Sequence, residues 1–230
     1  MTYISFDCYG TLIDFQIDRT LREVLGERLP PDIADAFCSS AAAYRFDEVL
    51  GPYAPYREVI ARSTQRAAAR YGIEYRPEDG SRIFEAIPTY GPFAEVPDAL
   101  KALAERFPLV ILSNAEEGQM AQTLRHLKTR FQAVLTAERA RAYKPRLAAF
   151  ETMLHVLGCG PEDIVHVSAS PQYDLRPARD LGIGTGVLVN RDAEPAQPWL
   201  GYLEIGELSE LPSLLGSRVP ERDRCGGTAG

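Results

Sequence analysis

The sequence has no run of basic residues that would offset its acidic excess. Its 32 acidic and 25 basic side chains give a formal charge of −7 at pH 7. Because nucleic acids and anionic membranes bind to local positive charge, this balance argues against either as the main partner. A small anionic substrate needs only a few local cations, so the total charge leaves that class of partner open.

Long apolar segments are also missing. No run approaches the roughly 18 apolar residues that a membrane helix requires, and the first residues lack the charged and apolar pattern of a secretory signal. We therefore expect a cytosolic (cytoplasmic) protein. The 230 residues, 45% of them hydrophobic, are enough for one large domain or for one domain with an insertion.

Cysteine is scarce and scattered. The four cysteines have no C-x-x-C spacing, so the sequence predicts neither a zinc site nor a disulfide framework; they are Cys8, Cys38, Cys159 and Cys225. Cys8 lies next to an acidic residue of interest, Asp7, where a reactive thiol is one interpretation. An unpaired cysteine is more commonly a small buried side chain, and we favour that interpretation.

The region from residue 15 to 92 is predicted to be entirely helical. Ile17, Leu21 and Val24 recur at spacings of three and four, which is the pattern of an amphipathic helix, and Pro30 and Pro31 end it. Apolar side chains with helical spacing continue through the rest of the region. The helices expected here are 17–28, 32–49, 56–71 and 78–87.

From residue 93 onward, short apolar runs alternate with helical patterns. We expect strands at 109–112, 133–136, 164–167 and 186–189, and helices at 96–106, 118–127, 147–157 and 171–181. Strands separated by helices of about ten to fifteen residues indicate βαβ units and a parallel sheet. The β-forming residues from Tyr3 to Phe6 add another strand to that sheet.

These patterns predict an α/β protein with a Rossmann-like parallel sheet and an inserted all-helical cap. Residues 1–14 and 93–216 would form the catalytic core, and residues 15–92 the cap. Near the end of the core, 202–205 is expected as an edge strand and 208–215 as a closing helix. Residues 217–230 are polar and glycine-rich, and we expect a disordered tail there.

Polar side chains follow the predicted strands. Asp7 ends the first strand and is followed by a turn at Gly10 and Thr11. Because ligands collect outside the carboxyl ends of parallel strands, Asp7 would face a site there. Each further polar group has an ordinary structural explanation, but their joint occurrence predicts one shared site. These groups are Ser113 with Asn114, Lys144 ahead of a helix whose first turn would hold Pro145, and Ser168 and Ser170 with Asp174.

Taken together, these segments resemble the haloacid dehalogenase (HAD) superfamily. The shared motifs are D-x-Y-G-T-L-x-D from Asp7, S-N from Ser113, Y-K-P from Tyr143, and a serine-bearing strand end that leads to Asp174. The resemblance covers almost the whole chain, and the helical insertion corresponds to the helical cap of that superfamily. It implies an HAD-like fold.

Two positions distinguish among the activities of this superfamily. Most members are magnesium-dependent phosphatases, which carry an acid two residues after the nucleophile and a metal-binding carboxylate in the last motif. Those positions are Tyr9, whose ordinary pKa of about 10 makes it a poor acid, and Ala169. Asp7 and Asp174 alone would bind magnesium weakly. The chain therefore resembles more closely the L-2-haloacid dehalogenases (type II), which have tyrosine at this position and use no metal.

This second resemblance implies a hydrolase that converts short 2-haloalkanoic acids to 2-hydroxy acids without a cofactor. Asp7 would displace halide from C2 and form an ester, which water then hydrolyses. Lys144 would keep Asp7 ionised by lowering its pKa, and Thr11 would help to position Asp7. Asp174, with Ser168, would orient or deprotonate the water.

The same resemblance implies a substrate pocket. Ser113, with backbone amides near Tyr9 and Gly10, would bind the substrate carboxylate, and Asn114 would contribute to the halide cradle. Tyr9 would line the pocket. Arg45, in the second cap helix, is a candidate cation for the departing halide, although a structural role explains it equally well.

The chain departs from the dehalogenases at two residues assigned to the pocket. Phe150 replaces a tyrosine, which makes the pocket more apolar, and Ser170 replaces an asparagine. The stretch before Asp174 also has the spacing of the phosphatases. Two alternatives stay open: a divergent phosphatase or phosphotransferase with a weakened magnesium site, and a non-catalytic HAD-like binding protein. Dimers are common in families that this chain resembles, so a homodimer is retained as an expectation.

Overall fold

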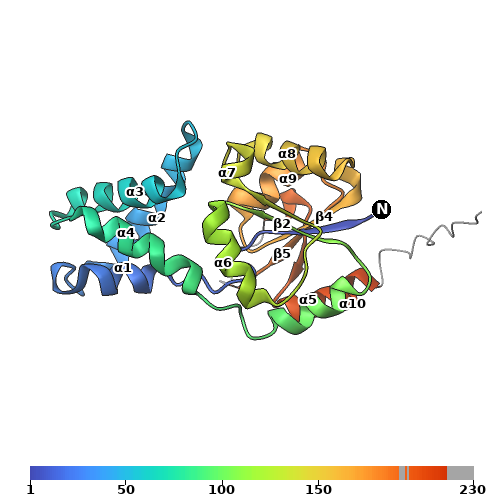
Figure 1. Cartoon of the computed structure of the whole chain (residues 1–230), viewed down its shortest axis with the longest axis horizontal. Coiled ribbons are helices and arrows are strands. Elements are labelled where there is room, and N and C mark those ends of the chain that lie inside the picture. Colours follow the sequence, from blue (N-terminus) through green and yellow to red (C-terminus); the bar gives the residue numbers. More distant parts are fainter. Residues whose placement is uncertain (192–194, 196, 217–230) are drawn as a thin grey trace, which may run out of the picture.

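Within the described residues, six strands form one sheet in which all neighbouring strands are parallel. The computed structural model describes residues 1–191, 195 and 197–216. The predicted α/β class is confirmed (Figure 1). The strands are β1 (Tyr3–Phe6), β2 (Leu109–Ser113), β3 (Ala133–Thr136), β4 (Ile164–Ser168), β5 (Thr185–Val189) and β6 (Leu203–Ile205).

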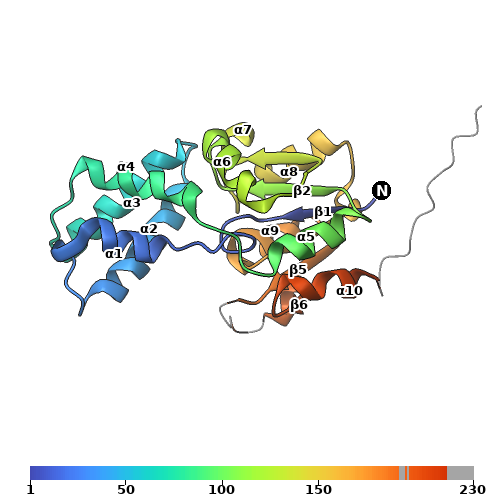
Figure 2. The same cartoon turned by 60° about the horizontal axis from the view of Figure 1, so that its bottom comes forward.

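Helices cover both faces of this sheet, and β2 and β4 are accordingly buried at every position. Val110 and Leu112 of β2 pack with side chains of α8 (Leu147–Leu157) and α9 (Arg176–Asp180) on one face. Ile111 points the other way, toward the larger core cluster, to which α5 (Val96–Ala104), α6 (Glu117–Leu127) and α10 (Leu211–Gly216) contribute. The neighbouring α5 and α10 are seen together in Figure 2.

The strand order β3-β2-β1-β4-β5-β6 places β1 at the centre. After β1 the chain adds β2 and β3 on one side and later returns to add β4, β5 and β6 on the other. The direction of winding therefore reverses between β1 and β4. In parallel α/β sheets, ligands bind outside the carboxyl ends of the strands at this reversal, which is where Asp7 follows β1.

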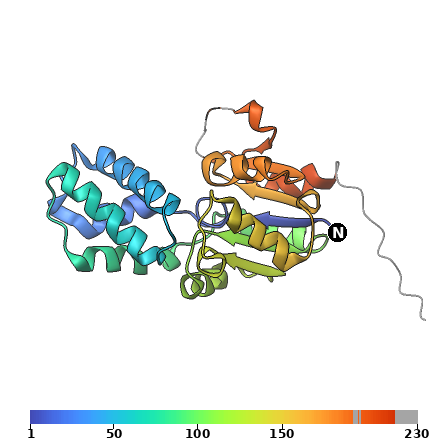
Figure 3. The same cartoon turned by 90° about the horizontal axis from the view of Figure 1, so that it is seen from above.

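The segment between β1 and α5 is helical, and its helices form a separate lobe beside the sheet (Figure 3). They are α1 (Ile17–Leu25), α2 (Ala34–Leu50), α3 (Tyr56–Tyr71) and α4 (Pro77–Ala86). The bounds of α3 agree with the sequence prediction, and Gly72 ends the helix in the left-handed conformation, at φ +67°. The α1 helix is shorter than predicted because residues 26–28 tighten into a single 3₁₀ turn.

Two connecting segments join this lobe to the sheet, and they run side by side. Asp14 N donates to Gly91 O at 3.0 Å, and Phe93 N donates to Leu12 O at 3.2 Å. Both connections thus pass close to the positions where the sequence suggests boundaries at residues 14 and 93. The division into a core and a cap is an interpretation that fits this arrangement.

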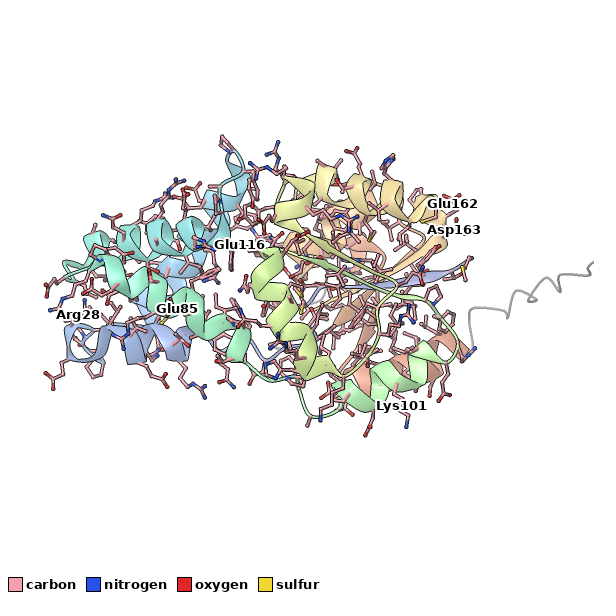
Figure 4. All side chains as sticks on the ribbon, viewed as in Figure 1. Arg28, Glu85, Lys101, Glu116, Glu162 and Asp163 are labelled. Atoms are coloured by element: carbon pink, nitrogen blue, oxygen red, sulfur yellow. The ribbon has the colours of Figure 1, made fainter. Side chains whose placement is uncertain are left out.

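The cap also contacts the core at a second place, away from the two connecting segments. Glu116, at the start of α6, faces the helical lobe (Figure 4) and accepts hydrogen bonds from Arg57 N at 3.0 Å and Arg57 Nη2 at 2.7 Å. Tyr143 OH donates to Ala54 O at 2.6 Å, and the Tyr143 ring stacks on Tyr53 with centroids 5.4 Å apart. The cap is therefore attached to the core at two places, through the connecting segments and through residues 53–57, and a cavity lies between cap and core.

The predicted helix at 171–181 is only partly present. Pro171–Leu175 forms a wide π-type turn, in which Ser170 O accepts from both Asp174 N and Leu175 N, and regular helix follows only in α9. Pro177 has no amide proton to donate to the carbonyl four residues earlier, so a regular helix cannot run through this segment.

Near Lys144 the structure contains one helix that was not predicted and corrects one prediction. A short helix, α7 (Ala137–Ala140), follows β3 directly and was not predicted, because four residues are too few to show a helical period. Pro145 does not lie in the first turn of the next helix: α8 begins at Leu147, with Arg146 as the residue before it. Lys144 is thus presented by a loop after α7.

Cys8 is fully buried, as expected for a small core side chain, and burial raises the pKa of its thiol well above the ordinary value. None of the helices in the described part of the chain is long and apolar enough to cross a membrane. The tail expected at 217–230, which includes Cys225, lies outside the described residues.

Candidate active site

A cavity of about 670 Å³ lies between the carboxyl ends of the strands and the helical cap. The sheet domain contributes most of the polar groups predicted from the sequence, and the cap contributes larger side chains. The lining includes Asp7, Tyr9, Ser113, Asn114, Lys144, Ser170, Tyr173 and Asp174 from the core, Phe15 from the connection, and Arg45, Val49 and Tyr56 from the cap.

Asp7 is held by its own strand and by the turn that follows it. Its backbone N donates to Val167 O of β4 at 3.0 Å, which continues the sheet pairing by one residue. Gly10 has φ +91°, a conformation that favours glycine, and the turn brings Thr11 back onto Asp7. Thr11 Oγ1 donates to Asp7 Oδ2 at 2.7 Å and accepts from Ala169 N at 2.9 Å. One oxygen of Asp7 is therefore fixed by Thr11.

Lys144 fixes the other oxygen of Asp7. Its ammonium group donates to Asp7 Oδ1 at 2.8 Å, Asp174 Oδ1 at 2.6 Å and Leu112 O at 2.8 Å. These three acceptors match the three protons of an ammonium group. The side chain is 1% exposed, so the site contains a buried cation shared between two carboxylates.

Asn114 holds the backbone of Lys144 in place. Its Oδ1 accepts from Lys144 N at 2.8 Å, and its Nδ2 donates to Lys144 O at 2.9 Å. The amide also lines the cavity. Asn114 thus positions the loop that carries Lys144. Its role in a halide cradle stays a proposal.

Burial and the shared lysine act differently on the two carboxylates. Burial raises the pKa of Asp7 above its ordinary value, and although Lys144 lowers it, as the sequence predicts, burial has the larger effect. Burial also acts to raise the pKa of Asp174, but Lys144 and His166 together outweigh it and lower that pKa. Asp7 is therefore the more basic of the two carboxylates.

The charge on Lys144 is stabilised by the same pair. Burial alone would lower the pKa of its ammonium group, but Asp174 and Asp7 outweigh burial and raise it. Lys144 is thus a permanent cation in the folded protein near neutral pH.

Ser113 presents an unused hydroxyl group to the cavity. It is 2% exposed, and its Oγ makes no hydrogen bond to any residue that the structure describes. A buried hydroxyl without a partner costs roughly 1–3 kcal/mol. Because Ser113 also lines the cavity, its unpaired hydroxyl group is a candidate to bind a polar group of a ligand.

Tyr9 lines the cavity, but its hydroxyl is engaged elsewhere. Its OH lies 2.6 Å from Thr123 Oγ1 of α6. Burial raises the pKa of Tyr9 well above the ordinary value of a tyrosine. A phenol with a raised pKa is a poor proton donor, so the position of the phosphatase acid is filled by a group that cannot readily replace it.

The two serines of the last motif shape the loop that carries Asp174. Ser168 Oγ accepts from Ser170 N at 2.9 Å, and Ser170 Oγ accepts from Tyr173 N at 3.1 Å. Ser170 also lines the cavity, whereas Ser168 is fully buried and is not part of the lining. Their contacts are those of residues that position Asp174.

Phe150 is not placed in the cavity, contrary to the sequence-based assignment of this residue to the pocket. It is fully buried on the face of the sheet covered by α8, with Val110 and Leu112. Its ring meets the imidazole of His166 edge-on, with centroids 5.3 Å apart. The assignment to the pocket is wrong because the residue points from α8 into the core beneath the strand ends.

Arg45 reaches the cavity from α2. Its guanidinium group lies 5.5 Å from the centre of the Phe15 ring, and it forms no ion pair with a described residue. A cation that faces a cavity without a carboxylate partner is available to an anionic ligand. This placement agrees with the proposed contact to a halide.

His166 is the buried site residue that the sequence analysis missed. Its Nε2 lies 2.9 Å from Asp174 Oδ1, and its Nδ1 lies 2.8 Å from Ser5 Oγ. The available signal was a histidine in an otherwise apolar strand, two residues before Ser168. Without the register of β1 and β4, that signal does not identify its partners.

The donor set does not fit a magnesium ion. The two carboxylates at the strand ends are bridged by the Lys144 ammonium group, and Ala169 stands where a third carboxylate would be needed. Magnesium prefers several oxygen ligands in octahedral geometry. In the described part of the chain, no group of three or more His, Cys, Asp or Glu side chains is arranged to hold a metal ion.

The reversed winding of the sheet, the inserted helices and the Asp7–Lys144–Asp174 cluster define an α/β protein with a Rossmann-like parallel sheet and a buried carboxylate–lysine site. The sequence pattern of the haloacid dehalogenase-like hydrolases matches residues 1–182. The chain belongs to this family, and the predicted superfamily is confirmed.

Named relatives fit this assignment. Haloacetate dehalogenase H-2 of Moraxella sp. (strain B) is 28% identical over 185 residues, which cover 78% of this chain and 81% of that protein. The (S)-2-haloacid dehalogenase of Xanthobacter autotrophicus is 28% identical over 186 residues, with 78% and 71% covered. A solved L-2-haloacid dehalogenase has a TM-score of 0.81 at 22% identity and covers 94% of this chain and 99% of that chain, which supports the fold alone.

Proposed function

We propose that this protein hydrolyses short 2-haloalkanoic acids to 2-hydroxy acids without a metal ion, through an ester on Asp7. The observation that supports the proposal most directly is the pair of hydrogen bonds to the carboxylate of Asp7. Thr11 and Lys144 hold its two oxygens, at 2.7 and 2.8 Å, beside a cavity whose described lining residues include no replacement for the phosphatase acid or the metal-binding carboxylate. The names of the relatives from Moraxella and Xanthobacter support the same chemistry.

In the first step, a carboxylate oxygen of Asp7 attacks C2 of the substrate. A C–O bond forms, the carbon–halogen bond breaks, and halide leaves with the bonding electron pair. Halide is a good leaving group, so this step needs no proton donor. Ser113 would bind the substrate carboxylate and Arg45 would meet the halide, a proposal supported by the position of both residues in the cavity lining.

In the second step, water attacks the carboxyl carbon of the Asp7 ester. Asp174 accepts a proton from the water and returns it to the departing alkoxide oxygen, so that the 2-hydroxy acid leaves with the oxygen that came from Asp7. The water oxygen stays in the carboxyl group of Asp7, which releases its remaining proton to solvent. Lys144 stabilises the negative charge that develops on the carbonyl oxygen. Covalent catalysis thus divides one slow displacement by water into two faster steps.

The proposal is tested by measuring halide release from 2-chloropropionate, 2-bromopropionate and chloroacetate in the presence of EDTA. We expect turnover by the wild type and loss of at least about 10³-fold in Asp7→Asn, because the amide cannot act as the nucleophile. Absence of halide from every substrate would refute the proposal.

Hydrolysis of p-nitrophenyl phosphate with and without magnesium, compared with Asp7→Asn, provides the contrasting measurement. Magnesium-stimulated phosphate release that depends on Asp7 would instead support a phosphatase. Release of neither halide nor phosphate would support a non-catalytic binding protein.

A further inference from the structure

A histidine is buried beneath the strand ends, in contact with the acid of the last loop. His166 lies in β4 and is fully buried. Its Nε2 is 2.9 Å from Asp174 Oδ1. An ionised carboxylate only accepts hydrogen bonds, so the Nε2 atom carries the proton and donates it.

The other side of the imidazole is fixed as well. His166 and Ser5 are paired residues of the parallel strands β4 and β1, and Ser5 Oγ lies 2.8 Å from His166 Nδ1. The Phe150 ring packs edge-on against the imidazole, at an interplanar angle of 73°. Both ring nitrogens have partners and the Phe150 ring packs against the imidazole, so these contacts fix the orientation of the imidazole.

This orientation determines how Asp174 is presented. Its Oδ1 accepts from two groups, His166 Nε2 and Lys144 Nζ, whereas its Oδ2 accepts no hydrogen bond from the residues that the structure describes. Asp174 lines the cavity. With Oδ1 anchored from two sides, the carboxylate cannot rotate, and Oδ2 is the oxygen left for a ligand or a water molecule.

We propose that His166 is a positioning residue for the hydrolytic half of the reaction: by holding Oδ1, it presents Asp174 Oδ2 to the water that cleaves the Asp7 ester. This inference rests on the proposed function. His166 is remote from the substrate, since it does not line the cavity, and it acts only through Asp174.

The two half-reactions use His166 differently. In the first step Asp7 attacks, and its oxygens are held by Thr11 and Lys144, neither of which contacts His166. In the second step the charge of Asp7 has been neutralised in the ester, and Asp174 is the group that must receive a proton. Loss of the His166 contact should therefore slow hydrolysis of the ester and leave its formation nearly unchanged.

Two amide substitutions separate the contacts of His166. In His166→Gln the amide nitrogen takes the place of Nε2 and can still donate to Asp174. In His166→Asn the shorter amide takes the place of Nδ1, keeps a partner for Ser5 and loses Asp174. Both variants bury an amide in place of the imidazole, so a difference between them does not come from burial of a polar group as such.

The experiment mixes each enzyme with excess 2-chloropropionate and follows halide release from the first turnover onward. For His166→Asn we expect a burst of about one halide per active site and then turnover slowed by about 100-fold, the lower end of the contribution of general-base catalysis. Mass spectrometry of the quenched protein should show the acyl adduct on the peptide that contains Asp7. His166→Gln should turn over within about threefold of the wild type, with no burst.

The result that would overturn the inference is equal behaviour of the two variants, or a uniform loss of both steps in His166→Asn. A double-mutant cycle with Asp174→Asn decides the matter if one amide variant folds poorly, because a residue that acts only through Asp174 adds no further defect when Asp174 is already changed. If the wild type releases no halide, the proposed function fails; if it does and the variants agree, only the role of His166 fails.

Discussion

Lys144 Nζ lies 2.8 Å from Asp7 Oδ1 in a site where the lysine is 1% and the aspartate 9% exposed. The same ammonium group is the cation that compensates Asp174. Removing one member of a buried ion pair leaves an uncompensated charge, which costs about 3–5 kcal/mol. Here, substitution of Lys144 alone would leave the carboxylates of both Asp7 and Asp174 without their shared cation.

Lys144→Met should lower the free energy of unfolding at pH 7 by about 3–5 kcal/mol. Without the cation, burial and mutual repulsion raise the pKa of Asp7 in the folded variant further above its unfolded value. A carboxyl with a raised folded pKa stabilises the folded state at pH below that pKa, and this contribution is lost as the pH rises through it.

The difference in unfolding free energy between wild type and Lys144→Met should therefore shrink as the pH is lowered from 7 toward about 5. Urea unfolding at several pH values measures it. If the difference in unfolding free energy does not change with pH, protonation of Asp7 does not contribute to it. Lys101→Met, on the exposed surface of α5 (Figure 4), is the control and should change stability by less than about 0.5 kcal/mol.

Ser113→Ala should separate binding from stability. The Oγ atom has no hydrogen-bond partner among the described residues, so its removal breaks no hydrogen bond with them and eliminates an unsatisfied buried polar group. We expect an unchanged or slightly higher melting temperature. The KM for 2-chloropropionate should rise by roughly 10- to 100-fold, because a hydrogen bond to a charged carboxylate contributes about 1.5–3 kcal/mol. A fall in stability with an unchanged KM would indicate a structural role only.

Tyr9→Phe distinguishes the dehalogenase from an enzyme that needs an acid at this position. The substitution removes the hydrogen bond to Thr123 and should cost about 1 kcal/mol of stability. Because the raised pKa of Tyr9 makes it a poor acid, kcat for halide release should stay within about threefold of the wild type. A loss of 10²-fold or more, with the fold intact, would assign proton transfer to Tyr9.

Most of the fold could be predicted from the sequence because each element has its own period and its own end signals. The bounds of α3, β3 and α8 agree with the predicted residues. The exceptions are local. The wide turn at 171–175 depends on a proline in the helix that follows, and α7 is too short to have a period.

The site was predictable where a residue stands at a strand end and less so where it depends on three-dimensional packing. Asp7, Lys144 and Asp174 follow from motif position, and the structure brings them together. His166 depends on the register of β4 against β1, which pairs it with Ser5, 161 residues away in sequence. Phe150 was assigned to the pocket by spacing alone, but the face of α8 on which it lies points to the core.

Arg45 provides the most direct test of the leaving-group contact. Its guanidinium group lines the cavity and touches the Phe15 ring, but it has no carboxylate partner among the described residues. Arg45→Gln should therefore change stability little. It should lower kcat/KM for 2-chloropropionate by roughly tenfold, which corresponds to about 1.4 kcal/mol of transition-state stabilisation.

The size of this defect should depend on the halogen. Chloride concentrates its charge more than iodide and gains more from a cation, so the loss in Arg45→Gln should decrease from chloro to bromo to iodo acids. Arg62→Gln is the matched control, because Arg62 lies on the exposed side of α3 and pairs with Glu58. An equal loss for all halogens, or an equal loss in Arg62→Gln, would show that Arg45 supports the cap and does not meet the halide.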